Sequence, residues 1–482
     1  MFPGDILLEV FDFCCLEASE DENFYDWWHV LVHVCQSWRQ LIFTSPRRLN
    51  VQLLCTCETP VRKKLDCWPQ IPIAIVDCCV GNLNRTKEDN LLTAFEHSDR
   101  VCSVKLTLSL KVPQLERVFK MMLKPFPVLT CLRVDLFNVW TIPGQPSGFL
   151  GGLTLSLQEL YLNHISLPAL PSILSSTSGL VDLHLCQLSK IDQVSPEVMA
   201  TSLAAMTKLK SFTIEFKSYH GRPLPVQNFG TRATLPSLTQ FQFEGNDGYL
   251  EDLVAQLDTP QLFDLTVMIL DISGQSVYQQ FPQLFQFVDR AEDLKLAQFR
   301  YAHVKIHSFH SFVHFYNPQT GQGLIHLTLG QAHSCVREPQ FHGQLRPMEA
   351  LLSQFSAIIS NVQHLSITPL HEKIIWEALF DSAEWLRIFR LFNSVETLCA
   401  GRPFPRRFVP MLNGLSNELV TEVLPALRML KIDGKPQKIV KKLLGPFIER
   451  RRSIGCPPLT IVKSHKVFER LQALGGTEGG TC

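Results

Sequence analysis

Four closely spaced histidines form the densest group of side chains in the sequence that could bind a metal. They are His303, His307, His310 and His314. Intervals of four, three and four residues would place them on one face of a helix, where imidazoles could act as ligands. However, Val304 and Ile306 alternate with Lys305 and His307, which suits an exposed strand edge at least as well. Because no carboxylate or cysteine pair accompanies the histidines, we expect no metal and no cofactor.

Fifteen cysteines are present, and nine of them precede residue 103. A zinc site would need paired CxxC spacing, which is absent. Cys55 and Cys57 belong to a strand-like stretch, residues 51–57, and are interpreted as buried neutral thiols. An odd number of cysteines without a framework fits a reducing compartment, so we expect the cytoplasm or the nucleus, or both.

Catalytic motifs are absent. The sequence contains no GxSxG, GxxxxGK[ST] or HExxH pattern, and no GxGxxG pattern after a strand. Scattered Cys, His and Asp residues could converge in space, but their spacing does not predict it. We therefore expect a protein that is not an enzyme.

The last part of the chain is basic. Between Lys431 and Arg470, eleven Lys and Arg residues stand against three acidic ones. Only Phe447 and Phe468 interleave with them, which gives little support for base stacking. A polar cap that ends a repeat array is favoured over a nucleic-acid contact.

The overall composition is balanced. The 482 residues include 45 basic and 45 acidic side chains, so no global field attracts nucleic acid or an anionic membrane. No run of 18 apolar residues predicts a membrane-spanning helix. Asp5 and Glu9 occupy the region where a secretory signal would carry basic charge, so neither export nor membrane attachment is expected.

A repeated element must position these side chains. The hexad apolar-x-x-apolar-x-apolar occurs twelve times, at intervals of 23 to 38 residues. The copies begin at Val101, Leu129, Leu157, Leu180, Leu209, Leu238, Leu262, Ala291, Leu324, Val362, Val395 and Leu427. Since side chains alternate across a strand, the fourth and sixth positions share one face and the third, fifth and seventh share the other. A half-buried strand is the simplest interpretation.

The second face of these strands is mostly polar, and its residues are candidates for contact with a protein substrate. They are Glu159, Tyr161, Asn163, Asp182, His184, Gln240 and Gln242. Plain exposure to solvent explains the same residue types equally well, so both interpretations stay open.

Helices are expected between the strands. Leu115, Val118, Phe119 and Met122 follow the first hexad at helical spacing. Two buried strand side chains supply about 3–6 kcal/mol, whereas ordering a unit of ~30 residues costs about 1–2 kcal/mol per residue. One unit therefore cannot fold alone. We predict an α/β leucine-rich-repeat-like solenoid with parallel strands on a concave face. It is expected to be irregular because no asparagine ladder is present.

The head of the chain predicts two helices. Residues 3–11 place Ile6, Leu7, Val10 and Phe11 on one helical face, after a proline. An acidic stretch, residues 17–26, leads to a second helix over residues 27–42. Ser45-Pro46 ends that helix, because a residue before proline disfavours helix.

These residues resemble the F-box motif. Pro3, the apolar pairs Ile6-Leu7 and Val10-Phe11, and Val34-Cys35-x-x-Trp38-Arg39 match its pattern. Residues 45–49, 59–63 and 96–102 are similar to the large F-box family of mushroom-forming fungi. The motif itself covers residues 1–50, and the looser likeness covers most of the chain.

The resemblance implies an adaptor of a Skp–cullin–F-box ubiquitin ligase, which docks on a Skp-type linker, reaches the cullin through it, and presents an unknown protein substrate. The linker contacts, or the packing beneath them, would come from Pro3, Ile6, Leu7, Val10, Phe11, Leu31, Val34, Cys35, Trp38 and Arg39. Trp38 could instead belong to the core of the head. The alternative is a non-catalytic interaction scaffold outside ubiquitin transfer, with the head only capping the array.

The expected organisation follows. Residues 1–50 form an F-box-like helical domain, and residues 51–95 a connecting strand and helix segment, with residues 71–76 as one strand. Residues 96–463 form the repeat solenoid, and residues 464–482 a C-terminal tail.

Overall fold

The computed structural model divides the chain into two compact units, Met1–Leu238 (unit 1) and Thr239–Cys482 (unit 2). The residues that it describes are 3–18, 27–46, 48–80, 84–109, 112–136, 149–152, 156–165, 170–188, 194–216, 232–270, 281–306, 310–319, 323–330, 345–369, 382–401, 405–433 and 442–464. His307, most of the acidic stretch and nearly all of the predicted tail therefore lie outside the described residues. Among the described helices, none combines the length and the apolar character that a membrane crossing requires.

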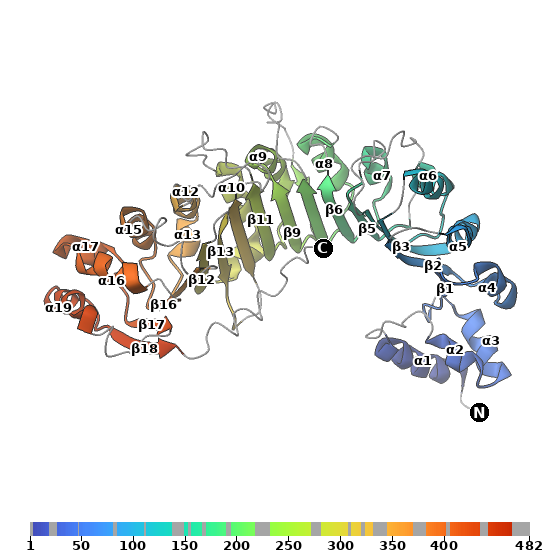
Figure 1. Ribbon diagram of the computed structural model, residues 1–482, viewed down its shortest axis with the longest axis horizontal. Coiled ribbons are helices and arrows are strands. Elements are labelled where there is room, and N and C mark those ends of the chain that lie inside the picture. The colour runs from blue at the N-terminus through green and yellow to red at the C-terminus, as the bar shows by residue number, and fades with distance from the viewer. Residues whose placement is uncertain are drawn as a thin grey trace. The chain divides into compact units, whose positions relative to one another are not determined.

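Unit 1 begins with three helices and then alternates strands with helices (Figure 1). Its elements are α1 (Gly4–Ala18), α2 (Trp28–Val32), α3 (Gln36–Thr44), β1 (Leu53–Cys55), α4 (Val61–Cys67), β2 (Ile73–Val80), α5 (Arg85–Glu96), β3 (Val101–Ser109), α6 (Val112–Met121), β4 (Cys131–Leu136), the short 3-10 helix η2 (Phe149–Gly152), β5 (Glu159–Asn163), α7 (Leu170–Ser176), β6 (Asp182–Leu188), α8 (Pro196–Leu203), β7 (Ser211–Phe216) and β8 (Ala233–Thr234). Strands β1 to β7 pair in chain order and every pairing is parallel.

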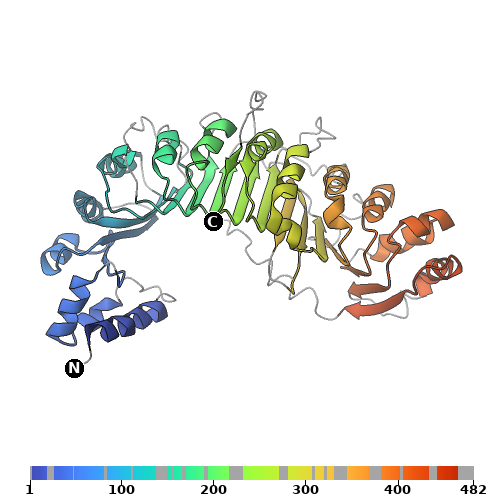
Figure 2. The ribbon, with the colours of Figure 1, turned by 180° about the vertical axis from the view of Figure 1, so that it is seen from behind.

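The hexads of unit 1 are confirmed as strands in register. The fourth position of one copy lies opposite the fourth position of the next, as in Leu132, Leu160 and Leu183. All three side chains are fully buried. Helices α5 to α8 cover this side of the strands, as both ribbon views show (Figures 1 and 2). The other side, bearing the third, fifth and seventh positions, is called the open face below.

Backbone bonds at the second position link successive copies where an asparagine ladder is absent. Thr130 N donates to Cys102 O, Gln158 N to Thr130 O, and Val181 N to Gln158 O, each over 2.8 Å. In these copies, a backbone carbonyl accepts a hydrogen bond from a backbone N–H of the following copy, which supports stacking without asparagine side chains.

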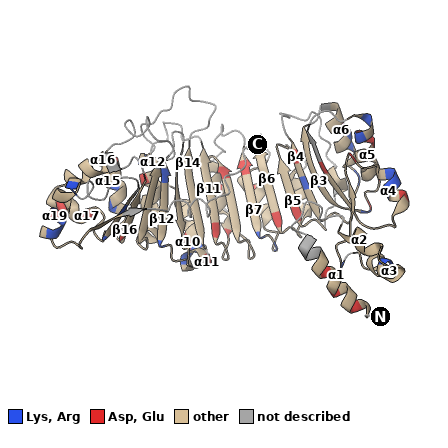
Figure 3. Cartoon of the chain, turned by 60° about the horizontal axis from the view of Figure 1, so that its bottom comes forward, with Lys and Arg blue, Asp and Glu red and all other residues tan. Residues whose placement is uncertain are grey.

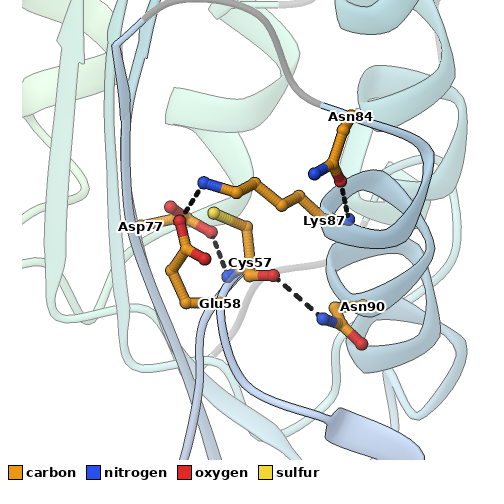
Figure 4. Close-up of polar contacts among 6 residues, drawn as sticks. All are labelled: Cys57, Glu58, Asp77, Asn84, Lys87 and Asn90. Carbon is orange, nitrogen blue, oxygen red and sulfur yellow. Dashed lines mark hydrogen bonds and ion pairs between the residues drawn. The ribbon is translucent and has the colours of Figure 1, made fainter.

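A buried carboxylate closes the first turn of the array (Figure 4). Asp77 of β2 lies opposite Leu106, on the helix-covered side, and is only 7% exposed. Its carboxylate accepts the backbone N–H of Cys57, and the Asn90 side chain of α5 donates to the Cys57 carbonyl at 2.9 Å. Lys87 forms an ion pair with Glu58 in the same loop. These contacts hold the loop after β1 against α5, so the polar cluster is structural.

The predicted single helix over residues 27–42 is wrong, because the structure forms α2 and α3 with a break at His33–Cys35. Cys35 is extended, with φ −158° and ψ 168°. The break exposes the Val32 carbonyl, which accepts a 2.9 Å hydrogen bond from Arg39 Nε. Val34 and Cys35 are consequently exposed instead of continuing an apolar stripe.

Unit 2 also alternates strands and helices, with most helices on one side of the strands (Figure 1). Its elements are β9 (Gln240–Gly245), α9 (Asp247–Ala255), β10 (Leu257–Asp258), β11 (Asp264–Leu270), α10 (Pro282–Arg290), α11 (Glu292–Leu296), β12 (Tyr301–Ile306), β13 (His310–Tyr316), β14 (Leu324–Gly330), α12 (Leu345–Gln354), α13 (Ser356–Ile359), β15 (His364–Pro369), α15 (Ser382–Leu391), β16 (Thr397–Ala400), α16 (Pro405–Asn413), α17 (Asn417–Glu422), β17 (Met429–Asp433), α19 (Gly445–Ser453) and β18 (Thr460–Ser464).

The order of strands in unit 2 departs from the chain order. It runs β9-β11-β14-β13-β12-β15-β16-β17-β18. Strand β13 is antiparallel to both β12 and β14, whereas the pairings β9–β11, β11–β14 and those from β12–β15 to β17–β18 are parallel. The expectation of one uninterrupted parallel stack is therefore wrong at this hairpin.

Two hexads of unit 2 are misplaced by the sequence pattern. The copy at Ala291 is wrong, because Ala291 precedes helix α11, whose first turn carries Glu292 and Asp293, which favour a helix N-terminus. The strand that pairs in its place is β12. The copy at Leu324 is a strand, but the register pairs Leu324 with Asp264, a third position, so the predicted start of this copy is two residues too late.

The basic segment near the end of unit 2 is partly structural. Arg451 is 1% exposed and donates to the carbonyls of Leu424, Pro425 and Leu427 at 3.0–3.2 Å. Arg450 donates to the carbonyls of Leu415 and Asn413. These guanidinium groups satisfy loop carbonyls at the last repeats, which favours the cap interpretation.

Candidate interaction surfaces

Helix α1 is apolar on two sides. Leu8 and Phe11 face inward, at 6% and 0% exposure, and the Phe11 ring meets Trp38 edge to face at a centroid distance of 4.9 Å. On the other side, Ile6, Val10 and Phe13 are 50%, 47% and 71% exposed. Their spacing of four and three residues makes one stripe along the helix. An apolar stripe that stays exposed beside a buried one is typical of a helix that binds a partner on its outer side.

The head concentrates the exposed apolar side chains of the described residues. Eight large hydrophobic residues are substantially exposed in the described part of the chain, and five of them belong to the head. These five are Ile6, Val10, Phe13, Val30 and Val34. We call them the head patch. Exposed apolar side chains gathered in one small region indicate an interaction surface.

The structure divides the residues that the sequence assigns to linker contact. Pro3, Ile6, Val10, Val34, Cys35 and Arg39 are exposed, Leu7, Leu31 and Trp38 are half-buried, and Phe11 is buried. Phe11 therefore supplies the packing beneath the surface. Sequence reasoning missed Phe13 and Val30, although Phe13 follows Ile6 and Val10 at helical spacing and could have been found that way.

Five of the predicted substrate residues lie together on the open face of unit 1. Glu159 is opposite Asp182, and Tyr161 is opposite His184, whose ring centroid is 5.9 Å away. On the neighbouring strand β4, the Arg133 guanidinium lies 4.6 Å from the centre of the Tyr161 ring. These side chains form a continuous row across β4, β5 and β6.

Several polar groups of this face are paired with one another, although Asn163 Oδ1 is buried without a partner. Asn163 donates to Asp135 at 2.9 Å, and His184 Nδ1 lies 3.0 Å from Thr213 Oγ1. Sequence reasoning missed Asp135, Arg133 and Thr213, although they occupy the same fifth and seventh positions as their neighbours. Figure 3 shows acidic residues among the strands labelled β5, β6 and β7.

Burial shapes the ionisation of this face. It raises the pKa of the Asp135 and Asp182 carboxyl groups and lowers the pKa of the His184 imidazole. Each group therefore prefers its neutral form more than it would in water.

Gln240 and Gln242 belong to unit 2, on β9. Both are exposed on its open face, opposite Asp264 and Thr266 of β11. Burial raises the pKa of Asp264 to about 6.

The histidines at 303 and 314 lie on β12 and β13, so this stretch forms strands as predicted. The expectation of an exposed edge is wrong, because β12 is paired on both sides and His303 is 6% exposed. His303 and His314 are Cα partners, with ring centroids 6.2 Å apart. In the described part of the chain, no three His, Cys, Asp or Glu residues are grouped so that they could hold a metal.

The described thiols of the early strands are poor nucleophiles. Cys55 and Cys57 are buried, as predicted, and burial raises the pKa of Cys55 and of Cys102 to about 11. A thiol with such a pKa is protonated at neutral pH and unreactive.

A hollow of about 600 Å³ in unit 1 lies between the end of the head and the first strands. Its lining includes Asn50, Asp99 and Arg100. The Arg100 guanidinium donates to the carbonyls of Pro69 and Ile71, so it holds a neighbouring loop in place.

Comparison with known proteins adds little. No family model matches the chain, and no curated protein matches it in sequence. The solved structure of the leucine-rich repeat-containing protein LegL7 from Legionella pneumophila is similar over 80% of this chain and 94% of its own, at 12% identity and a TM-score of 0.27. The α/β architecture itself stands on the strand pairing: repeated strands, mostly parallel, with helices between them, as the sequence predicts.

Proposed function

We propose that this protein is a non-catalytic substrate receptor of a Skp–cullin–F-box type ubiquitin ligase. The head would bind a Skp-type linker, and the linker would connect it to the cullin. The open face of the repeats would hold a protein substrate. The observation that carries the proposal is the stripe of Ile6, Val10 and Phe13 along the outer side of α1.

The physical argument for the proposal is that these three apolar side chains are exposed in the free chain and would be stabilised by burial. These three residues are 47–71% exposed to water in the free chain. Burying them against apolar helices would contribute about 1.5–3 kcal/mol for each fully covered side chain. Amphipathic helices laid on partner helices are a known mode of recognition.

The core of the head supports the stripe from beneath. Phe11 and Trp38 pack together, so α1 and α3 form one body. Arg48 forms an ion pair with Glu9 at 2.5 Å and lies 3.8 Å from Asp12. These contacts fix the orientation of α1 before any partner arrives, and a rigid surface loses less entropy on binding.

An interaction scaffold outside ubiquitin transfer is the second candidate, and one observation favours it. Trp28 is fully buried, donates its indole N–H to the Gln52 carbonyl at 3.0 Å, and meets Trp68 at 5.1 Å. The head is thus packed on the first strands of unit 1, as a cap would be. In this alternative, the head patch would have no linker to bind.

The decisive experiment measures binding of the full-length chain to a purified Skp-type linker. Deleting the head would expose Trp68 and the first strand, so surface substitutions are the sharper tool. Ile6→Asp with Val10→Asp should weaken binding by at least about 100-fold, since two central apolar contacts are lost. Both positions are about half exposed, so the thermal unfolding midpoint should stay within a few degrees.

Leu296→Asp is the matched control. Leu296 is 75% exposed but belongs to α11 in unit 2, so its replacement should leave linker binding unchanged. Absence of linker binding by the unaltered chain, or equal binding by the double variant, would reject the receptor and leave the scaffold.

A further inference from the structure

Unit 2 carries a row of buried and half-buried polar side chains that the proposed function does not use. His326, His314, His303 and Ser366 are successive Cα partners across β14, β13, β12 and β15. The His314 and His326 rings lie only 3.8 Å apart. We call these four residues the histidine row. They lie on the open face, because Val304 and Ile367, their neighbours along the chain, are buried beneath the helices.

Two atoms of this row have no hydrogen-bond partner. The other two histidines are satisfied, since His303 Nε2 lies 2.7 Å from Thr368 Oγ1 and His326 Nε2 lies 2.9 Å from Thr328 Oγ1. By contrast, His314 Nε2 and the hydroxyl of Ser366, a residue 6% exposed, are buried and unpaired. A buried polar atom without a partner costs about 1–3 kcal/mol, so its persistence calls for an explanation. A ligand that completes these bonds is one.

Aromatic rings border the row. On one side, Tyr301 stacks on His364 at 4.3 Å and on Tyr316 at 5.5 Å. On the other side, the Phe312 ring lies 4.9 Å from the His314 ring, with Lys305 Nζ 5.1 Å from the Phe312 centroid. All of these rings except that of His303 are half-buried, so they offer apolar area to a partner together with phenol and imidazole donors.

On strands β12 to β16 the charged side chains are positive only, whereas on β17 Asp433 accompanies Lys431. Strands β12, β13, β14, β15 and β16 contain five of the sixteen histidines of the chain but no Asp or Glu. Lys305 lies on β12 and Lys431 follows on β17. After the larger effect of burial, Lys305 lowers the pKa of His303 and, less than the neighbouring imidazoles do, that of His314. Lys431 lowers the pKa of His364, and Glu396 opposes it. The positive field of the lysines therefore reaches the row.

Lys305 and Lys431 supply ammonium donors to this face, its hydroxyls and imidazoles can each donate a hydrogen bond, and strands β12 to β16 supply no carboxylate. Carboxylates are the side chains that only accept, and they complement such a surface in both charge and hydrogen bonding. We propose that the histidine row and its flanking lysines bind an extended, acidic peptide segment of a protein partner. The three intervals from β14 to β15 measure roughly 14 Å, which about five extended residues would span.

This inference does not depend on whether the head binds a linker, and it is tested with the full-length chain alone. The probe is a fluorescein-labelled peptide of alternating Glu and Gly, with a second peptide in which Gln replaces each Glu. Fluorescence anisotropy should show the Glu peptide binding at least about tenfold more tightly than the Gln peptide at low salt, with the difference shrinking as salt screens the charges.

Variants at two positions locate the site. Lys431→Glu should weaken the Glu peptide about tenfold or more, and Lys431→Gln should weaken it less without reversing the charge. Ser366→Ala should weaken both peptides about threefold, because it removes a donor and no charge. Lys105→Glu, on the open face of unit 1, is the control and should leave binding unchanged.

Three results would overturn the inference. Equal binding of the Glu and Gln peptides would remove the role of charge. Unchanged binding by Lys431→Glu and Ser366→Ala together would place the site elsewhere. A labelled single-stranded RNA that bound more tightly than the Glu peptide, and lost binding in the same variants, would assign the face to nucleic acid.

Discussion

The open faces of the two units use the same strand positions for opposite chemistry. In unit 1, four carboxylates on β4 to β7 lie among Arg133, Tyr161 and His184, and Asp135 and His184 are hydrogen-bonded within the face. On the open face of unit 2, β12 to β16 carry imidazoles and phenols, no carboxylate, and two unpaired buried polar atoms, His314 Nε2 and Ser366 Oγ. The face of unit 1 leaves a buried acceptor unpaired, Asn163 Oδ1, whereas that of unit 2 leaves an imidazole nitrogen and a hydroxyl.

The antiparallel hairpin explains part of this difference. It brings residues 303, 314 and 326, which are only 11 or 12 positions apart, onto three adjacent strands. Parallel neighbours in unit 1, such as Tyr161 and His184, come from separate repeats. A hairpin can therefore place the same side-chain type on adjacent strands from a short stretch of sequence. In parallel repeats, adjacent strands come from separate copies whose residues at these positions differ.

Acidification should separate the two faces most strongly. Burial lowers the pKa of His303 to about 3 and of His314 to about 2. Below pH ~6.5 the unfolded chain binds protons that the folded chain excludes, so stability present above that pH is lost as pH falls. Two imidazoles at about 1.4 kcal/mol per pH unit each give a loss of roughly 4 kcal/mol between pH 7 and pH 5.

Urea unfolding of the chain and of the double variant His303→Gln, His314→Gln at both pH values measures this loss. The variant should lose several kcal/mol less on acidification, and subtraction removes the opposing contribution of Asp264. His184→Gln in unit 1 is the control, with a smaller change in slope. If the free energy of unfolding changed equally with pH in the unaltered chain and in the double variant, the two imidazoles would not have lowered pKa values.

The turn that enters β14 should be the next most sensitive point. Gly323 has φ +83°, and a Cβ built there would lie 2.3 Å from the Ala297 Cβ. Gly323→Ala should cost about 3 kcal/mol, from backbone strain and overlap together. Thermal or urea unfolding checks this loss, with Gly445→Ala as the control because its Cβ meets nothing within 4 Å. If Gly323→Ala destabilised the protein less than Gly445→Ala, the turn before β14 would tolerate a side chain at position 323.

Removing a hydroxyl should have opposite effects on the two faces. Ser366→Ala deletes an unpaired buried group and should stabilise unit 2 by about 1 kcal/mol. Thr213→Ala removes the partner of His184 Nδ1 and should destabilise unit 1 by about 1 kcal/mol. Urea unfolding midpoints give both signs. If both variants changed the stability in the same direction, the proposed difference in hydrogen bonding between the two open faces would be wrong.

The smallest expected effect concerns Arg133. Its guanidinium stacks on the Tyr161 ring but is exposed, so Arg133→Ala should cost only about 0.5–1 kcal/mol. Arg133→Lys should retain part of that energy. A loss of several kcal/mol in urea unfolding would indicate that the row on unit 1 is structural.

The recurring apolar positions were predictable because they obey local geometry. Leu160 and Leu162 read as a half-buried strand from alternation alone, and the structure buries both. The break at Cys35 was not predictable, because the residues on either side fit a continuous helix and only an extended Cys35 frees the Val32 carbonyl for Arg39. The helix at Glu292 was missed because an apolar hexad fits a helix as well as a strand over so few residues.

The candidate surfaces divide in the same way. Ile6 and Val10 were recognisable as one helical face, but which side of α1 points to solvent depends on the packing of Phe11 against Trp38. Sequence order placed His303 and His314 near each other without showing that Ser366, more than fifty residues later, completes their row.

By itself, the sequence determined the repeat period, the buried side of most strands and the presence of a helical head, since each depends on side-chain spacing within a few residues. The tertiary structure decided the reversal at β13, the unpaired atoms of the histidine row and the outward stripe of α1. Those features depend on which distant segments pack together, and that choice is made by the free energy of the whole fold.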